Sequence, residues 1–382
     1  MQIVVAMDSF KGSLTSLQAG NAVAEAAKKL DQSIEVHVCS LADGGEGTVD
    51  ALYTGLGGTL VELTVSGPLA QPVSVRYCIL PGGITAVIEM ACAAGLTLVP
   101  PERRDPMNTT TYGVGQVIRD AIYRGCRNFI VGIGGSGTND GGIGMLTALG
   151  YAFLDKNGDP IPVCGGGLEM LDSIRTADVL PQLRDCTFRI ACDVSNPLCG
   201  SNGCSAVFGP QKGASAEMIT QMDIWLKKYA EIAKNISDKA DADHPGAGAA
   251  GGLGFAFLAF TNATLEPGGK IILEETRLAQ LIRDADLVVT GEGRLDSQTV
   301  MGKAPIAVAQ LAKQYGKKVI AFCGCVGEGA EECNRHGIDA YFPIARVSSV
   351  LEDALNPERA YNNLKDTAYQ VLRLVHLRRE NS

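Results

Sequence analysis

The sequence predicts an α/β protein of two domains, the second inserted into the first. Three observations support this prediction. The chain has 382 residues, more than the ~100–200 residues typical of one domain. Both chain ends alternate short apolar runs with stretches of helical periodicity, which is typical of parallel βαβ units. The middle of the chain instead shows short alternating strands followed by glycine-rich loops.

The first forty residues predict one βαβ unit. Ile3 to Met7 is a short apolar run and predicts a strand. Thr15-Ser-Leu-Gln18 is typical of a capping box, and apolar residues at helical spacing follow it as far as Leu30. Ile34 to Val38 predicts the next strand. A strand, a helix and a second strand in this order indicate a parallel sheet.

The same alternation returns near the C-terminus. The predicted elements are a strand at Leu287 to Thr290, a helix at Ala304 to Tyr315, a strand at Val319 to Cys323, a further helix and strand as far as Phe342, and a terminal helix ending near Leu377. Neither chain end alone has enough parallel strands to bury a sheet on both faces. We therefore expect residues 1–60 and 285–382 to form one discontinuous flavodoxin/Rossmann-like domain, doubly wound around a parallel sheet. Residues 61–284 are expected to form the inserted α/β domain.

Composition favours a small-molecule partner. The chain has 33 Lys and Arg against 42 Asp and Glu, a formal net charge of -9, which disfavours nucleic acid and anionic membranes. The longest apolar stretch, Gly248 to Phe260, is shorter than the ~20 residues of a membrane span. The twelve cysteines include no CxxC pair and the N-terminus shows no cleavable leader, so we expect reduced thiols in the cytoplasm.

Glycines gather where chemistry is expected. The chain has 46 of them, about 12% of its residues, against ~7% in an average protein. They cluster with polar residues in five stretches: Asp8 to Ser13, Asp43 to Thr48, Gly134 to Gly142, Phe208 to Gly213, and Gly291 to Asp296.

The first two stretches each follow a predicted strand and precede a predicted helix. Open α/β sheets bind ligands at this end of their strands, so the backbone N–H groups of the first stretch and the Lys11 ammonium are candidates for binding an oxyanion, and Asp8 and Ser9 for binding substrate. Asp43 is a candidate metal carboxylate. A second interpretation stays open for both stretches, in which they are hydrophilic turns whose polar residues cap a helix or complement its dipole.

The third stretch is the most informative. Its five glycines surround four polar side chains and follow the apolar run Phe129 to Ile133, so the backbone can approach a phosphate closely. The candidates are Gly135, Ser136, Thr138 and Asn139 for phosphate and Asp140 for a metal. Gly132-x-Gly134-x-x-Gly137 also matches a dinucleotide fingerprint, but no helix follows at once and the expected acidic residue is only loosely placed. A nucleotide-cofactor oxidoreductase is therefore kept as an alternative.

Asp193 and the last two glycine-rich stretches add a lysine and further acidic residues. Asp193 follows the predicted strand Phe188 to Cys192, a position typical of a general base or a metal-held carboxylate facing a cleft; helix capping is the competing interpretation. Lys212 lies in the fourth stretch. Glu292 and Asp296 follow another predicted strand end, with Gln298 before the next helix. Mg²⁺ commonly takes one or two such carboxylates.

These motifs together resemble the bacterial type I glycerate kinases. The matching strings are DSFKGSL, ADGGEGT, IEMACAAGL, RDPMNTTTYGVG, GGSGTNDGGIGMLTALG, ACDVSNPLCG, FGPQKGAS, GAGAAGGLG and TGEGRLDSQT, in the family's order and spacing from Ile3 to the terminal helix. The chain departs from the family pattern at Met7, Gly137 and Cys204. The resemblance implies a kinase that transfers a phosphoryl group from ATP, with Mg²⁺, to D-glycerate, with 2-phosphoglycerate favoured over 3-phosphoglycerate as the product.

Residues and resemblance together give one set of expected roles. Lys11 and Asp193 are expected to be catalytic. Asp8, Ser9, Arg104, Gly135, Ser136, Thr138, Asn139, Lys212, Glu292 and Gln298 are expected to bind substrate or phosphate, and Asp43, Asp140 and Asp296 to bind the metal. The expected partners are D-glycerate and ATP, with no nucleic acid and no membrane; the oligomeric state is open, a homodimer being one option. A non-enzymatic two-domain binder of small molecules is the second alternative.

Overall fold

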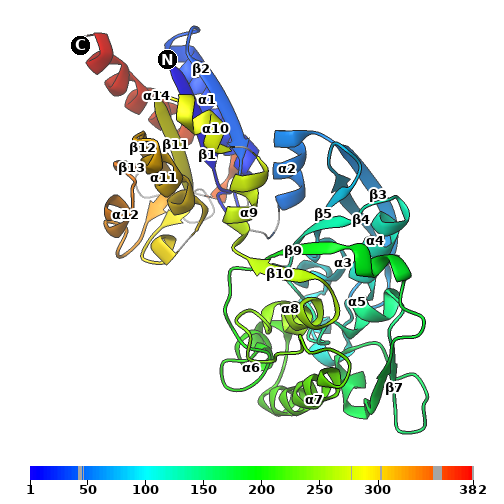
Figure 1. The fold of residues 1–382 in the computed structure, drawn as a ribbon. Coiled ribbons are helices and arrows are strands. Elements are labelled where there is room, and N and C mark those ends of the chain that lie inside the picture. The colour runs from blue at the N-terminus through cyan, green and yellow to red at the C-terminus, as the bar shows by residue number, and fades with distance from the viewer. Residues whose placement is uncertain (42–44, 46, 277, 302, 347–354, 381–382) are drawn as a thin grey trace. The chain divides into compact units, whose positions relative to one another are not determined.

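A computed structural model describes residues 1–41, 45, 47–276, 278–301, 303–346 and 355–380 (Figure 1). The chain divides into two compact units. The first comprises Met1–Asp43, Asp50–Leu56 and Gly269–Ser382, and the second Gly44–Val49 and Gly57–Gly268. The sequence placed the boundaries at residues 60 and 285. The later division falls after Gly268 because α9 (Gly268–Glu275) and α10 (Leu278–Asp284) group almost entirely with the first unit, where α10 contacts β1 and α11.

The first unit contains a five-stranded sheet in the order β13-β12-β11-β1-β2. Its strands are β1 (Gln2–Met7), β2 (Glu35–Ser40), β11 (Leu287–Leu295), β12 (Lys318–Val326) and β13 (Ala340–Pro343), and every pair is parallel. Numbered within the unit, the order is 2-1-3-4-5, which is the flavodoxin-like arrangement. The predicted parallel sheet built from both chain ends is confirmed.

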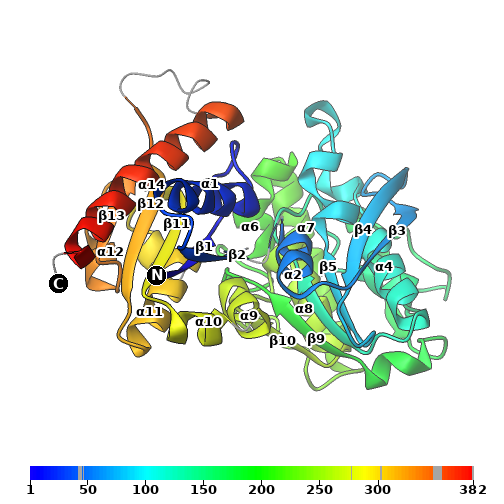
Figure 2. The same ribbon diagram turned by 90° about the horizontal axis from the view of Figure 1, so that it is seen from above.

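Helices cover this sheet on both faces. The chain moves from β1 to β2 in one direction across the sheet and from β11 to β13 in the other, so right-handed crossovers place their helices on opposite faces. Helix α1 (Ser16–Leu30) packs against α14 (Pro357–Glu380), while α11 (Ala304–Gln314) packs on β1, β11 and β12 (Figure 2). The predicted capping box starts α1: Thr15 Oγ1 accepts from Gln18 N at 3.2 Å, and Gln18 Oε1 accepts from Thr15 N at 2.9 Å.

The second unit contains a mixed six-stranded sheet in the order β10-β9-β6-β5-β4-β3. Its strands are β3 (Thr59–Ser66), β4 (Pro72–Ile79), β5 (Thr85–Glu89), β6 (Asn128–Gly132), β9 (Thr187–Ala191) and β10 (Ala263–Glu266). The predicted alternating strands form its antiparallel end, because β3, β4 and β5 pair in succession. Strands β5, β6, β9 and β10 are parallel.

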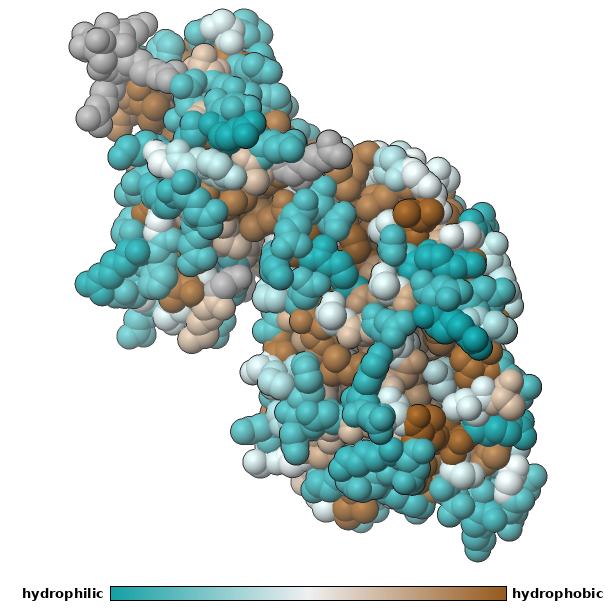
Figure 3. All heavy atoms as spheres, in the orientation of Figure 1, coloured by the Kyte–Doolittle hydropathy of each residue, from teal (hydrophilic) through white to brown (hydrophobic). Residues whose placement is uncertain are grey.

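The helices between these parallel strands build the core of the second unit. They are α3 (Ala91–Ala94), α4 (Tyr112–Tyr123), α5 (Ile143–Ala148), α6 (Cys204–Phe208), α7 (Ala216–Lys234) and α8 (Ala249–Phe260). Phe129 and Phe188 stack on adjacent strands with ring centroids 4.7 Å apart. Among the described residues, no helix combines the length and the apolarity that crossing a bilayer requires. Hydrophilic and apolar residues are interspersed on the face of the molecule drawn in Figure 3.

Candidate functional site

The sheet order of the first unit defines a topological switch point. Strand β1 lies between β2 and β11, and the connections from β1 and from β11 leave in opposite directions. In open α/β sheets ligands bind outside the carboxyl ends of the strands at this point. Here the stretch after β1 meets the end of β11: a Cβ on Gly293 would lie 3.3 Å from Phe10 Cα and from Lys11 N. The first and fifth glycine-rich stretches are therefore neighbours.

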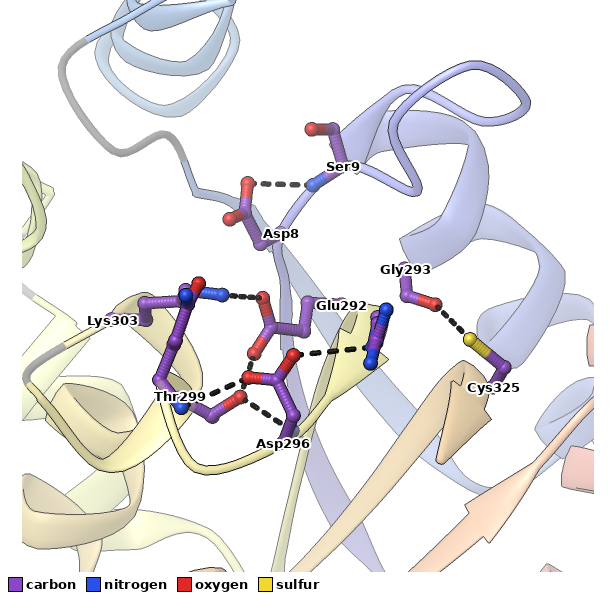
Figure 4. Close-up of polar contacts among 10 residues, drawn as sticks. Asp8, Ser9, Glu292, Gly293, Asp296, Thr299, Lys303 and Cys325 are labelled. Atoms are coloured by element: carbon purple, nitrogen blue, oxygen red, sulfur yellow. Dashed lines mark hydrogen bonds and ion pairs between the residues drawn. The ribbon is translucent and has the colours of Figure 1, made fainter. Parts of the chain in front are cut away.

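Three predicted residues come from the turn after β1. The Asp8 side chain is 6% exposed, and its Oδ1 accepts from Ser9 N at 2.6 Å (Figure 4). Asp8 N donates to Gly291 O at 2.8 Å, which ties the turn to β11. Lys11 is exposed on the same turn.

Glu292 occupies a different position from the one expected. The sequence placed it after a strand end, but β11 continues to Leu295 because β12 also extends, pairing Glu292 with Cys323 and Arg294 with Cys325. The Glu292 side chain is 9% exposed. Its Oε1 accepts from Thr299 Oγ1 at 2.7 Å, and its Oε2 lies 3.5 Å from Lys303 Nζ (Figure 4). Burial raises the pKa of Glu292, against the opposing effects of Thr299 and Lys303.

Asp296 and Gln298 form a short turn beside Glu292. Asp296 Oδ1 accepts from Gln298 N at 2.9 Å, and Asp296 Oδ2 lies 3.2 Å from Arg294 Nε. The Gln298 side chain is exposed. Thr299 was not singled out from the sequence, yet its buried hydroxyl connects this turn to Glu292. An Asp followed three residues later by a Thr that starts a helical turn is the signal that could have revealed it.

The main glycine-rich loop belongs to the second unit and follows β6. Gly135 has a φ of +73°, in the left-handed region, and its carbonyl accepts from Leu96 N at 2.9 Å. Ser136 is 9% exposed, and Thr138 and Asn139 are fully buried. Asn139 Nδ2 donates to Ser205 Oγ at 2.9 Å. The buried atoms Thr138 Oγ1 and Asn139 Oδ1 have no hydrogen-bond partner within the described part of the chain, so the loop keeps unused polar capacity.

Lys212 packs against this loop. Its side chain is 2% exposed, and Nζ donates to Ser136 Oγ at 2.7 Å and to Thr138 O at 2.6 Å. Burial lowers the pKa of Lys212 to about 8, although the nearby Cys204 and Asp140 act in the opposite direction. The third and fourth glycine-rich stretches, which lie far apart in the sequence, are thus joined through one ammonium group.

Asp140 is fully buried and its carboxylate is saturated with hydrogen bonds. Oδ2 accepts from Thr111 N, from Thr111 Oγ1 and from Gly144 N, and Oδ1 accepts from Gly142 N, at 2.8 to 3.2 Å. Burial raises the pKa of Asp140 against these hydrogen bonds. This geometry favours a structural role, because the carboxylate already accepts four hydrogen bonds from protein groups; metal binding by Asp140 stays a prediction.

Asp193 and Arg104 also belong to the second unit. Asp193 Oδ1 accepts from Gly268 N, the first residue of α9, at 3.0 Å. This contact agrees with the competing interpretation, in which Asp193 caps a helix, while a catalytic role stays a prediction. Arg104 Nη1 donates to Gln211 O at 3.5 Å, next to Lys212, and Arg104 Nε is buried without a partner among the described residues.

The described residues fit Mg²⁺ only as a site with one or two carboxylates. Within the described ranges, no group of three His, Cys, Asp or Glu residues is arranged to hold a metal. Asp43 lies outside these ranges. Asp296, beside the buried Glu292, is the remaining candidate, and Mg²⁺ commonly completes such a shell with waters and phosphate oxygens.

Fold and geometry define a two-unit α/β protein with a glycine-rich loop around a buried lysine and with carboxylates at a flavodoxin-like switch point. The glycerate kinase family model matches residues 3–376, and the chain belongs to that family. It is thus a kinase, a phosphotransferase, and the oxidoreductase and non-enzyme alternatives are not retained.

Individual proteins agree with the family assignment. The chain is 45% identical to the glycerate kinase of Haemophilus influenzae, covering 98% of this chain and 99% of that protein. It is 44% identical to the glycerate 2-kinase of Escherichia coli K12, covering 95% of each. The crystal structure of a chain described as glycerate kinase 2 from Salmonella typhimurium LT2 superposes with a TM-score of 0.90 at 43% identity, covering 100% of this chain and 99% of that one.

Proposed function

We propose that this protein transfers the γ-phosphoryl group of ATP to D-glycerate in the presence of Mg²⁺ and forms 2-phosphoglycerate. The observation that carries the proposal is the buried Lys212 ammonium bound to Ser136 and Thr138 of the glycine-rich loop. A glycine-rich loop with an adjacent cation suits a phosphate or carboxylate. The name of the E. coli relative, glycerate 2-kinase, supports the regiochemistry.

Phosphoryl transfer requires positioning and charge neutralisation more than covalent chemistry. In the proposal, the loop from Gly135 to Asn139 and Lys212 bind oxyanions in the second unit, and Arg104 pairs with the glycerate carboxylate through its planar guanidinium. In the first unit, Asp8, Ser9 and Gln298 bind substrate, and Lys11 stabilises charge that develops during transfer.

Asp193 is the favoured carboxylate for orienting the acceptor hydroxyl. Because the hydroxyl loses its proton late in a loose transition state, orientation is the larger part of this role. Asp296 would hold Mg²⁺, which neutralises phosphate charge when bound.

The test is an assay of the purified protein with ATP, MgCl₂ and D-glycerate, with the product identified by NMR. We expect ADP release only when D-glycerate and Mg²⁺ are both present, and a product phosphorylated at the 2-hydroxyl. Undiminished turnover in excess EDTA would refute the Mg²⁺ requirement, and 3-phosphoglycerate as the product would refute the regiochemistry. Glycerol, which lacks the carboxylate, is the matched control and should not be phosphorylated.

A further inference from the structure

One oxygen of the Glu292 carboxylate is held by the hydroxyl of Thr299. Thr299 is fully buried, and its Oγ1 accepts a hydrogen bond from Asp296 N at 3.1 Å. The same oxygen donates to Glu292 Oε1 at 2.7 Å. A hydroxyl has only one proton, and the acceptor side of Thr299 is occupied by an N–H group. The hydroxyl proton is therefore directed at Glu292 (Figure 4).

The other carboxylate oxygen faces a weaker partner. Glu292 Oε2 lies 3.5 Å from Lys303 Nζ, and the Lys303 side chain is 39% exposed. A carboxylate at this distance from a partly exposed ammonium still has lone pairs for another donor. Two residues earlier, on the same face of β11, the Thr290 hydroxyl is buried without a partner among the described residues. Glu292 Oε2 and the Thr290 hydroxyl thus both keep hydrogen-bonding capacity at the switch point.

The charges of the proposed substrates restrict what Glu292 can bind. A carboxylate accepts hydrogen bonds and repels anions. ATP phosphates and the carboxylate of a hydroxy acid offer it no donor, whereas a hydroxyl does. Lys303, beside it, is complementary to the negative group that accompanies that hydroxyl in both substrates. A carboxylate and an ammonium side by side therefore match a hydroxyl near an anionic group.

We propose that Glu292 binds a substrate hydroxyl at the switch point between β1 and β11, and that Thr299 is a positioning residue that fixes the Glu292 carboxylate for this contact. The inference rests on the proposed function. The hydroxyl belongs either to the hydroxy acid that accepts the phosphoryl group or to the ribose of the nucleotide, and kinetics separate these sources.

The experiment compares Thr299→Val, which keeps the shape and removes the donor, with Thr299→Ser, which keeps the donor. Thr276→Val is the matched control, because the buried Thr276 hydroxyl of the same unit donates to a helix carbonyl, Ile272 O. For Thr299→Val we expect kcat/KM to fall on the order of 10- to 100-fold, the scale of one hydrogen bond to a charged group. We expect Thr299→Ser and Thr276→Val to remain within about threefold of the original protein.

The substrate whose KM rises in Thr299→Val identifies the source of the hydroxyl. A higher KM for D-glycerate with an unchanged KM for ATP assigns it to the hydroxy acid, and the reverse assigns it to ribose. Calorimetry is carried out with D-glycerate alone and with a non-hydrolysable ATP analogue alone. Binding should weaken for the ligand that corresponds to the substrate whose KM rises. Glu292→Gln should reproduce the selective effect.

Three outcomes would overturn the proposal: unchanged kinetics in Thr299→Val, an equal loss toward both substrates, or a loss that Thr299→Ser does not restore. Thermal unfolding of every variant is measured in parallel. A loss of kcat/KM that only parallels a loss of thermal stability also counts against the proposal. If the original protein does not phosphorylate D-glycerate at all, the proposed function fails, which is distinct from these outcomes.

Discussion

The Lys212 ammonium lies 2.7 Å from the Ser136 hydroxyl and is almost completely removed from solvent. Asp140 and Cys204 lie close enough to influence its charge, but the two hydrogen bonds of Lys212 go to Ser136 and to the Thr138 carbonyl. Burying an ammonium in this way is costly, and proteins accept that cost most often at functional sites. Lys212 therefore serves both the structure and the electrostatics of the glycine-rich loop.

The first prediction concerns the pH dependence of stability. The pKa of Lys212 is lowered from 10.5 to about 8 in the folded protein. Between these values the unfolded chain binds more protons than the folded one, so this group makes folding more favourable as pH rises. Against Lys212→Met, the free energy of unfolding of the original protein should gain up to about 1.4 kcal/mol per pH unit in this window. Urea unfolding of both proteins at pH 7.5 to 10 measures this dependence. If the difference between their free energies of unfolding does not change with pH, the pKa of Lys212 is not lowered.

The second prediction separates structure from metal binding at Asp140. An asparagine at position 140 replaces one carboxylate oxygen by an NH₂ group, so a donor then faces either Gly142 N or the N–H groups of Thr111 and Gly144, and buried donors are left unpaired. Asp140→Asn should lower the free energy of unfolding by about 3 kcal/mol. Asp155→Asn is the control, because Asp155 accepts backbone hydrogen bonds from an exposed turn and should matter much less. An Asp140→Asn protein of normal stability that needs more Mg²⁺ for half-maximal rate would instead indicate a metal ligand.

The third prediction concerns Lys11. It is exposed on the turn after β1, next to the end of β11. If its ammonium stabilises charge during transfer, Lys11→Ala should lower kcat by about 100-fold. Lys28→Ala removes an exposed lysine of α1 that binds the Gln32 carbonyl, and it should leave kcat unchanged. A loss of less than about threefold in Lys11→Ala would assign Lys11 to a solvated turn.

The sheet of the first unit was predictable because its signals are local. Apolar runs marked the strands, and the capping box from Thr15 to Gln18 marked the start of α1. The end of β11 was not predictable in this way. Its extension through Glu292 depends on pairing with Cys323 and Cys325 of β12, and glycines on both sides of Glu292 suggest a loop when pairing partners are unknown.

The site was predictable as a set of stretches but not as a set of contacts. Chemistry-bearing residues in glycine-rich segments pointed to Ser136 and to Lys212, and the structure brings these two together. The roles of Asp140 and Thr299 depend on partners that sequence spacing does not reveal, such as Thr111, which lies 29 residues before Asp140. Long-range hydrogen bonds of this kind exist only once the chain has folded.

The last prediction concerns Asp193, whose carboxylate caps α9 through Gly268 N. Capping and orientation of a substrate hydroxyl can be separated because an asparagine side chain still accepts a hydrogen bond through its amide oxygen. If the charge orients the acceptor hydroxyl, Asp193→Asn should lower kcat by about 100-fold or more, with little change in the KM for ATP or in stability.

Asp193→Ala, which also removes the cap, should additionally lower the free energy of unfolding by about 1 kcal/mol. A requirement for more Mg²⁺ in Asp193→Asn, with kcat restored at high Mg²⁺, would identify a metal ligand instead of an orienting group. If kcat stays normal in Asp193→Asn while Asp193→Ala loses stability, the contribution of Asp193 is the cap of α9, and another residue must orient the hydroxyl.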